Sequence, residues 1–238
     1  MRAVLLAGGK GTRLYPYTAV FPKPLVPIDN VPIMEILIRQ LKHYGFDHIT
    51  LCVGHLSYLL KSYFGNGENF GVKIDYSLEQ KPLGTVAPLT LINDLPKTFL
   101  VANGDLLTDA DFGSMIKTHK NSKAALTVGV YNRHEKIELG VLDISNSQIT
   151  GYREKPEMDF SVSAGCYVFE KKVLELVPKN EYFDFPSLVN ILLENKTKIA
   201  PFVIDGYWLD IGRPDDYQKA IEKFSMNKGL FLKEFHVK

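Results

Sequence analysis

The sequence is poor in cysteine and in long apolar runs. Its two cysteines, Cys52 and Cys166, lie inside apolar segments, and no Cys or His pair has the spacing of a zinc site. We therefore expect two buried, reduced thiols and no structural zinc. No stretch reaches the ~18 apolar residues that a membrane-spanning helix needs. Because the first apolar segment reads as a strand followed by charge, it does not resemble a signal peptide, and we expect a cytoplasmic protein without membrane contact.

An excess of charge of either sign is also missing. The chain has 28 Lys and Arg against 27 Asp and Glu, a formal net charge of +1, so nothing predicts binding to nucleic acid or to an anionic membrane. The six histidines form no HxxxH or HExxH pair, and no Ser/His/Asp or Cys/His set stands out. Charge is nevertheless uneven along the chain, because the first 30 residues carry Arg2, Lys10, Arg13 and Lys23 against Asp29 alone.

Short apolar runs alternate with helical periodicity in the first half of the chain. Strands are predicted at 3–7, 49–53, 72–78 and 98–102, and helices at 32–44, 56–64 and 85–92. The second half predicts mainly strands, at 124–131, 139–144, 148–152 and 163–169 with a hairpin turn at 145–147, and then helices at 185–193 and 214–224. This order indicates one α/β domain over 1–225 with a tail at 226–238. We expect a Rossmann-like, mostly parallel mixed sheet flanked by helices, with an antiparallel insertion.

A glycine-rich loop follows the first predicted strand, in the stretch "LLAGGKGTRLYPYTAVFPKPL" over 5–25. Ligands bind at the carboxyl ends of strands in open α/β sheets, and Gly8, Gly9 and Gly11 stand at such an end. Glycines permit positive φ and close approach, so successive N–H groups can form an anion nest. Arg13 and Lys23 add a planar fork and a point charge for phosphate oxygens. The stretch therefore predicts a phosphate site.

Two familiar phosphate loops do not fit this stretch. A dinucleotide fingerprint would need glycine where Leu14 stands, and no Walker A string occurs. "LAGGKGTRL" followed by "PKPLVPI" instead resembles the signature of the sugar-1-phosphate nucleotidylyltransferases, which implies the nucleotide-diphospho-sugar transferase type of fold. The resemblance implies that Arg13 and Lys23 act in catalysis. It also implies a set of nucleotide-binding residues: Leu6, Ala7, Gly8, Gly9, Gly11, Thr12, Arg13, Lys23, Gln80, Gly84 and Thr85.

The stretch "EQKPLGTVAPL" resembles the nucleobase loop of that family. Gln80 can pair with a base edge, and Gly84 lets the ring lie near the backbone. The family usually has LGTAG where this chain has LGTVA, so Val86 and Ala87 add side-chain bulk beside the expected base pocket.

Two aspartates are the candidate metal ligands. Asp105 follows the strand at 98–102 in "NGDLLTD", and Asp210 lies in "GYWLDIGRPDDY". Magnesium prefers one or two carboxylates together with phosphate oxygens and waters. Each aspartate alone could equally be a turn residue, and the resemblance implies that both hold Mg²⁺. Four other acids read as helix N-terminal residues: Asp109, Asp111, Asp215 and Asp216.

A further set of residues resembles the family's sugar site. In "GYREKPE", the resemblance implies that Glu154 binds sugar hydroxyls and Lys155 the sugar phosphate, although an EKP string is also typical of a solvated strand edge. "SAGCY" corresponds to a segment that often reads NAG in the family, with Ser163 in place of asparagine. The residues expected to bind the sugar phosphate are Asn103, Gly140, Glu154, Lys155, Ser163 and Gly165.

The implied activity is transfer of a nucleoside monophosphate from a nucleoside triphosphate to a sugar 1-phosphate. The second pKa of the sugar phosphate is near ~6, so it is already a nucleophile, and direct in-line displacement of pyrophosphate needs no general base. The strings look most like the guanylyltransferase-type members, which favours GTP. Uridylyl, thymidylyl or cytidylyl transfer, a regulatory protein that binds nucleotide sugars without turnover, a nucleotide-binding scaffold, and a homo-oligomer all stay open.

Overall fold

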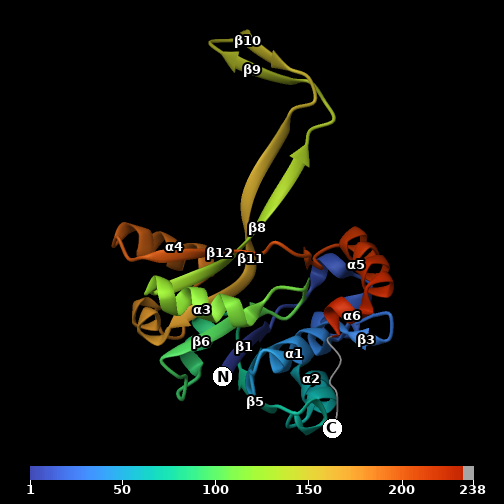
Figure 1. Cartoon of the computed structure of the whole chain (residues 1–238), viewed down its shortest axis with the longest axis vertical. Helices are drawn as coiled ribbons and strands as arrows, with labels where there is room; N and C mark the ends of the chain where they lie inside the picture. Colours follow the sequence, from blue (N-terminus) through green and yellow to red (C-terminus); the bar gives the residue numbers. More distant parts are fainter. Residues whose placement is uncertain (233–238) are drawn as a thin grey trace.

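A mixed sheet forms the centre of the molecule in the computed structural model, which describes residues 1–232 (Figure 1). The sheet has seven strands in the order β12-β8-β11-β6-β1-β4-β5. These are β1 (Arg2–Ala7), β4 (His48–Val53), β5 (Lys73–Leu78), β6 (Thr98–Asn103), β8 (Leu126–Lys136), β11 (Glu157–Glu170) and β12 (Ile199–Val203). β12 and the first six residues of β11 were not predicted from the sequence. β12 is apolar throughout but contains Pro201, which argues against a strand. Residues 157–162 alternate polar and apolar side chains, a strand pattern that could have identified them.

The pairing of the strands confirms the predicted fold class. β1 pairs in parallel with β4 and β6, β4 with β5, and β8 with β12. β11 alone is antiparallel, to β6 on one side and β8 on the other. Two short antiparallel pairs lie beside the main sheet: β7 (Leu106–Thr108) with β13 (Trp208–Asp210), and β2 (Pro27–Ile28) with β3 (Val31–Pro32).

Helices α1 (Ile33–His43), α2 (Ser57–Phe64) and α3 (Phe112–Ser122) cover one face of the sheet, and α4 (Phe185–Glu194) covers the other. Two more helices, α5 (Pro214–Met226) and α6 (Lys228–Phe231), pack in a separate cluster. The sequence analysis did not predict the span of α3, although it placed Asp111 at a helix N-terminus. The Asp111 side chain accepts a hydrogen bond from Ser114 N at 2.8 Å, which confirms that role. Among the helices of residues 1–232, none is long and apolar enough to span a membrane.

The helix predicted at 85–92 is wrong. Only a 3₁₀ helix occurs there, at Ala87–Leu91. Pro88 has no N–H to donate, and the local bonds that form are of the tighter i to i+3 kind, such as Leu89 N to Val86 O at 3.0 Å. The N–H groups of Val86 and Ala87, for which the first turn of a helix has no internal acceptor, donate to Phe183 O at 3.1 and 3.2 Å. A distant carbonyl thus anchors the start of this segment.

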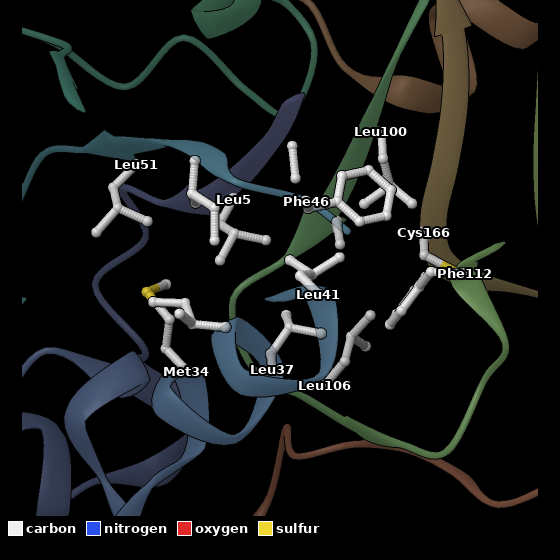
Figure 2. Close-up of a cluster of buried hydrophobic side chains, with 14 of the residues drawn as sticks. Leu5, Met34, Leu37, Leu41, Phe46, Leu51, Leu100, Leu106, Phe112 and Cys166 are labelled. Carbon is white, nitrogen blue, oxygen red and sulfur yellow. The ribbon is translucent and has the colours of Figure 1, made fainter. Parts of the chain in front are cut away.

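Buried side chains on the two faces of the sheet explain the strand sequences. Ala3, Leu5 and Ala7 pack in the cluster under α1, α2 and α3, whereas Val4 packs in the cluster under α4 on the opposite face. Figure 2 shows the first cluster, in which residues of β1, β4 and β6 face residues of α1: Leu5, Leu51 and Leu100 with Met34, Leu37 and Leu41. A strand buried on both faces needs a continuous apolar run, as β1 has.

A third hydrophobic cluster packs α5 and α6 against the loops that follow β1. Phe224 of α5 and Phe231 of α6 are fully buried with Leu14 and Val26. The tail predicted at 226–238 therefore begins at the last residue of α5 and contains a packed helix. Residues 233–238 lie outside the described residues.

Residues 132–162, here named the arm, leave the sheet as a two-stranded ribbon (Figure 1). β8 and β11 continue beyond their sheet partners, and β9 (Val141–Ser145) and β10 (Gln148–Arg153) form a hairpin at the tip. Asn146 and Ser147 have φ of 49° and 63°, which suits the turn of a two-residue hairpin and confirms the turn predicted at 145–147. The antiparallel insertion therefore projects away from the sheet.

Candidate active site

A cleft of about 740 Å³ opens at the carboxyl ends of β1 and β6. The structure brings every residue predicted to bind the nucleotide to its lining, although these come from three separate stretches of the sequence. They are Leu6, Ala7, Gly8, Gly9, Gly11, Thr12, Arg13, Lys23, Gln80, Gly84 and Thr85. Parallel strands end at the same edge of the sheet, which explains why loops distant in sequence converge here.

The conformation of the first loop depends on Gly11. Its φ is 64°, in the left-handed region, and its carbonyl accepts hydrogen bonds from the Thr18 hydroxyl at 2.8 Å and from Leu14 N at 2.9 Å. A Cβ added to Gly11 would lie 3.0 Å from Lys23 Cβ and from Thr18 Cγ2. Because the loop passes this close to Lys23, its position is coupled to that of the Lys23 ammonium.

The loop after β5 also needs a glycine. Gly84 has φ of 87°, and an added Cβ would lie 2.7 Å from Phe183 O. The Thr85 hydroxyl accepts a hydrogen bond from Phe185 N at 2.8 Å, so it fastens this loop to the start of α4. Val86 and Ala87 are buried in the core beneath the loop, so their extra bulk does not narrow the base pocket as the sequence had suggested.

Lys23, Asp105 and Asp210 form the charged centre of the site. β13 pairs with β7 so that Asp210 stands opposite Leu106, directly beside Asp105. The Lys23 ammonium forms an ion pair with Asp105 Oδ2 and lies 3.7 Å from Asp210 Oδ1. The Lys23 side chain is only 12% exposed. Buried oxygens Oδ1 of Asp105 and of Asp210 have no hydrogen-bond partner among the described residues.

The neighbouring groups perturb the pKa of Asp210. Burial raises the pKa of Asp210, and the charge of Asp105 raises it further, while Lys23 and Arg13 lower it. The Arg13 guanidinium lies against the loop after β13, since a Cβ on Gly212 would be 3.5 Å from its Nη1. The buried Lys23 ammonium thus faces two carboxylates, so a further positive charge would stabilise this centre.

Asp105 and Asp210 fit a magnesium ion. Hard carboxylate oxygens are the protein ligands this ion prefers, and each residue has a buried oxygen that accepts no hydrogen bond from the described residues. Residues 1–232 contain no group of three or more metal-ligating side chains. Magnesium bound here would therefore take its other ligands from phosphate oxygens and waters.

A second cavity, of about 300 Å³, adjoins the cleft. It shares Thr85 and Asn103 with the cleft. Three residues predicted for the sugar phosphate line it: Asn103, Ser163 and Gly165. Tyr167, stacked on Phe185 with ring centroids 3.9 Å apart, forms part of its wall, as does Trp208. Asp210 also lines this cavity whereas Asp105 lines the cleft, so the carboxylate pair lies where the two spaces meet.

The other three residues predicted for the sugar phosphate lie elsewhere. Gly140, Glu154 and Lys155 are exposed on the arm, where the tip hairpin β9–β10 joins β8 and β11, and they line neither cavity. Glu154 accepts a hydrogen bond from the Tyr152 hydroxyl, and Lys155 Nζ lies 4.0 Å from Glu138 Oε2. Within one chain, the structure does not bring these residues to the site.

Several lining residues were missed from the sequence. Tyr182 reaches the cleft from the loop before α4, and Glu79 lies beneath it with a carboxyl pKa that burial raises. Trp208 and Gly212 lie in the string that contains Asp210, which was a signal that could have identified them. No local pattern marks Tyr182, because a chain crossing from the other side of the domain brings it there.

Comparisons with known proteins agree with this geometry. The family model described as nucleotidyl transferase matches residues 2–227. The chain is 34% identical to the UTP–glucose-1-phosphate uridylyltransferase of Synechocystis sp., over 93% of this chain and 62% of that protein. It is 32% identical to the D-glycero-alpha-D-manno-heptose 1-phosphate guanylyltransferase of Aneurinibacillus thermoaerophilus, over 92% of this chain and 96% of that protein. It is also 32% identical to the mannose-1-phosphate guanylyltransferase of Mycobacterium tuberculosis, over 92% of this chain and 63% of that protein.

The chain thus spans less than two thirds of the Synechocystis and M. tuberculosis proteins and nearly all of the Aneurinibacillus protein. Among solved structures, HddC from Yersinia pseudotuberculosis superposes with a TM-score of 0.73 at 28% identity, over 94% of this chain and 99% of that one. A second structure of HddC, complexed with GMP-PN, matches with the same TM-score at 27% identity.

Proposed function

Since the chain belongs to the nucleotidyl transferase family, we propose that it transfers the nucleoside monophosphate of GTP to a sugar 1-phosphate. The products are pyrophosphate and a nucleotide-diphospho-sugar. The observation that carries the proposal is the junction of two cavities at one carboxylate pair. A glycine-loop cleft suited to a triphosphate meets a smaller cavity suited to a sugar, with Asp105 in one lining and Asp210 in the other.

The residues of the cleft are suited to hold and neutralise phosphates. The N–H groups of the loop at 8–11 and the Arg13 guanidinium bind the triphosphate, and Lys23 stands beside the reacting phosphate. An oxygen of the sugar phosphate bonds to the α-phosphorus while the bond to the bridging oxygen breaks, and pyrophosphate carries away the electron pair. Asp105 and Asp210 would hold magnesium, which would supply positive charge to the reacting phosphates. Catalysis then rests on position and charge.

The preference for GTP rests on the strings around the site and on the relatives. The Aneurinibacillus guanylyltransferase matches this chain over nearly its whole length, and the mycobacterial relative is also a guanylyltransferase. The uridylyltransferase is similar to a comparable degree, so uridylyl, thymidylyl and cytidylyl transfer are the alternatives. A regulatory protein without turnover is less favoured, because Arg13, Lys23 and Asp105 are all present at the cleft.

A substrate matrix tests the proposal. Purified chain with Mg²⁺ is offered GTP, UTP, dTTP, CTP and ATP, each against several sugar 1-phosphates, and pyrophosphate release is followed. We expect the fastest release with GTP. Release with UTP alone would reject the guanylyl preference and keep the reaction. Silence in every combination, with tight binding of a nucleotide sugar, would reject the reaction and favour the regulatory protein.

A further inference from the structure

A group of exposed lysines lies at the edge of the sheet opposite the cleft. β11 is antiparallel to both β6 and β8, and β12 is parallel to β8, so β6, β8 and β12 all begin at this edge. The cleft lies at the carboxyl ends of β1 and β6. We give the name lysine patch to eight exposed lysines in the segments 93–98, 117–126, 170–176 and 193–199: Lys97, Lys117, Lys120, Lys123, Lys171, Lys172, Lys196 and Lys198.

Backbone hydrogen bonds join these four segments into one surface. Lys171 N donates to Lys97 O at 2.7 Å, Ala125 N donates to Lys198 O at 3.0 Å, and Glu170 N donates to Ala125 O at 3.0 Å. The end of α3 leads into Ala125 and therefore brings the lysines of its last turns to the same place. Figure 1 shows α3, α4 and β6 together at the left of the molecule, where this surface lies.

The lysine patch has an excess of positive charge. Its four segments contain eight lysines against four acids, which are Asp94, Glu170, Glu175 and Glu194. Two of these acids are already engaged, since Asp94 pairs with Arg2 at 2.8 Å and Glu170 accepts a hydrogen bond from the Thr98 hydroxyl. Because the whole chain has a net charge of only +1, its other residues together are acidic. The expectation of no membrane contact rested partly on that net charge, which averages over this uneven distribution.

The patch lysines have no carboxylate partners of their own. Among residues 1–232, the lysines that form ion pairs within 4.0 Å all lie outside the patch: Lys23, Lys73, Lys136, Lys155 and Lys228. The charges of the patch are therefore available to an external anion.

Exposed leucines lie among these lysines. Leu193, in the last turn of α4, is 59% exposed, and Lys196 N donates to its carbonyl at 2.9 Å. Leu176 ends the 3₁₀ helix that begins at Lys171 and is 40% exposed. Proteins that lie on a bilayer combine the two kinds of side chain, because cations bind the anionic headgroups while apolar side chains enter the acyl boundary.

The composition of the patch favours lipid over nucleic acid. Its four segments contain no Arg, Phe, Tyr or Trp, and their one histidine, His119, is 2% exposed and bonded to the Thr127 hydroxyl at 2.8 Å. Proteins that bind nucleic acid use arginine contacts and aromatic rings stacked on bases. Lysines act as hydrated point charges, which suits the diffuse negative charge of a lipid surface.

We propose that the lysine patch binds this chain to an anionic lipid bilayer, with Leu176 and Leu193 entering the headgroup region. The cleft lies at the opposite edge of the sheet and stays open when the patch is docked. None of the patch lysines or the two leucines lines either cavity, so this inference does not depend on the proposed function.

Vesicle sedimentation tests the proposal. The purified chain is mixed with vesicles of phosphatidylcholine, alone or with about 30% phosphatidylglycerol, in about 50 and 500 mM NaCl. We expect binding to the anionic vesicles at low salt, a fall in affinity of about 10-fold or more at high salt, and little binding to phosphatidylcholine alone. No binding to anionic vesicles at low salt, or equal binding to both kinds of vesicle, would overturn the inference.

Charge reversal locates the binding surface. A lysine near an anionic surface contributes about fivefold in affinity, so Lys171→Glu/Lys198→Glu should weaken binding by about 100-fold or more. The control Lys61→Glu/Lys219→Glu makes the same change in net charge at exposed lysines of α2 and α5, and should bind within about twofold of wild type because these charges lie beyond the screening length. Equal losses in both variants would show that binding follows net charge, which would overturn the assignment to the patch.

Two of the lysines allow removal of charge without harm to the fold. Lys123 ends α3 with φ of 53°, and Lys196 follows α4 with φ of 52°, in the left-handed region where glycine is the usual residue. Lys123→Gly/Lys196→Gly should therefore keep the wild-type Tm or exceed it, while binding to anionic vesicles falls about 10-fold. Unchanged binding in this variant would contradict the inference.

Two further measurements test the leucines and the kind of partner. Leu176→Ser/Leu193→Ser should weaken binding to anionic vesicles about 10-fold, and unchanged binding would overturn the insertion of these side chains. A fluorescent single-stranded RNA of mixed sequence should bind more weakly than the anionic vesicles at equal salt. Tighter binding to the RNA would reject the bilayer as the partner of the patch.

Discussion

Replacing Gly11 by alanine should disturb both the fold and the nucleotide site. An alanine at φ of 64° costs about 1–2 kcal/mol relative to glycine. The new Cβ would also lie 3.0 Å from Lys23 Cβ and Thr18 Cγ2, so one of these must move. We expect Gly11→Ala to lower the free energy of unfolding by about 2 kcal/mol, which lowers the Tm by roughly 4–8 °C for a domain of this size.

The matched control is Gly9→Ala, since an added Cβ there meets nothing within 4 Å. Thermal unfolding should show the loss of Tm in Gly11→Ala and a change of no more than about 2 °C in Gly9→Ala, given that unstrained surface changes stay within about 0.5 kcal/mol. Displacing Lys23 should also raise the KM for GTP of Gly11→Ala. If Gly11→Ala matched the wild type in both Tm and KM, the argument that the loop position depends on Gly11 would be refuted.

Three further predictions concern charge, thiols and fluorescence. Lys23→Met should raise the pKa of Asp210 further, since Lys23 lowers it. A carboxyl whose pKa rises on folding stabilises the fold at low pH and loses that contribution as pH rises above about 4. The Tm deficit of metal-free Lys23→Met should therefore be larger at pH 7 than at pH 4, and equal deficits would contradict this. Burial raises the thiol pKa of Cys52 and of Cys166 to about 12, so a disulfide reagent at pH 7 should label neither until the protein unfolds. Trp208 is the single tryptophan and lines the second cavity, so its fluorescence should change on adding a sugar 1-phosphate, and an unchanged spectrum at saturation would place the sugar elsewhere.

The parts of the site that directly follow predicted strands could be predicted from the sequence. Gly8 to Gly11 follow a buried apolar strand, and Asp105 follows another, so the rule that ligands bind at strand ends placed them together. The fold class followed in the same way from alternating strands and helices. In each case, neighbours in the sequence determine the structure.

Features that depend on contacts between distant parts of the chain could not be predicted from the sequence. The carbonyl of Phe183 accepts the N–H groups of Val86 and Ala87 at the start of the segment predicted as a helix, and no local pattern predicts this contact. Tyr182 reaches the cleft from the same distant segment. The strand pattern of the arm gave its hairpin correctly, but alternation of side chains does not say where a ribbon points. The resemblance implied that Lys155 belongs to the sugar site. The fold instead places Lys155 on the arm, far from the cavities of its own chain.

We propose above that Asp105 and Asp210 form the reaction centre between the two cavities. The most direct test compares magnesium-dependent pyrophosphate release, from GTP and the best sugar 1-phosphate, in the wild type and in Asp105→Asn. The amide keeps the shape of the side chain and removes the charge that would bind the ion. We expect a loss of at least 100-fold with a folded protein, and near-normal turnover in Asp105→Asn would contradict the assignment of Asp105 to the reaction centre.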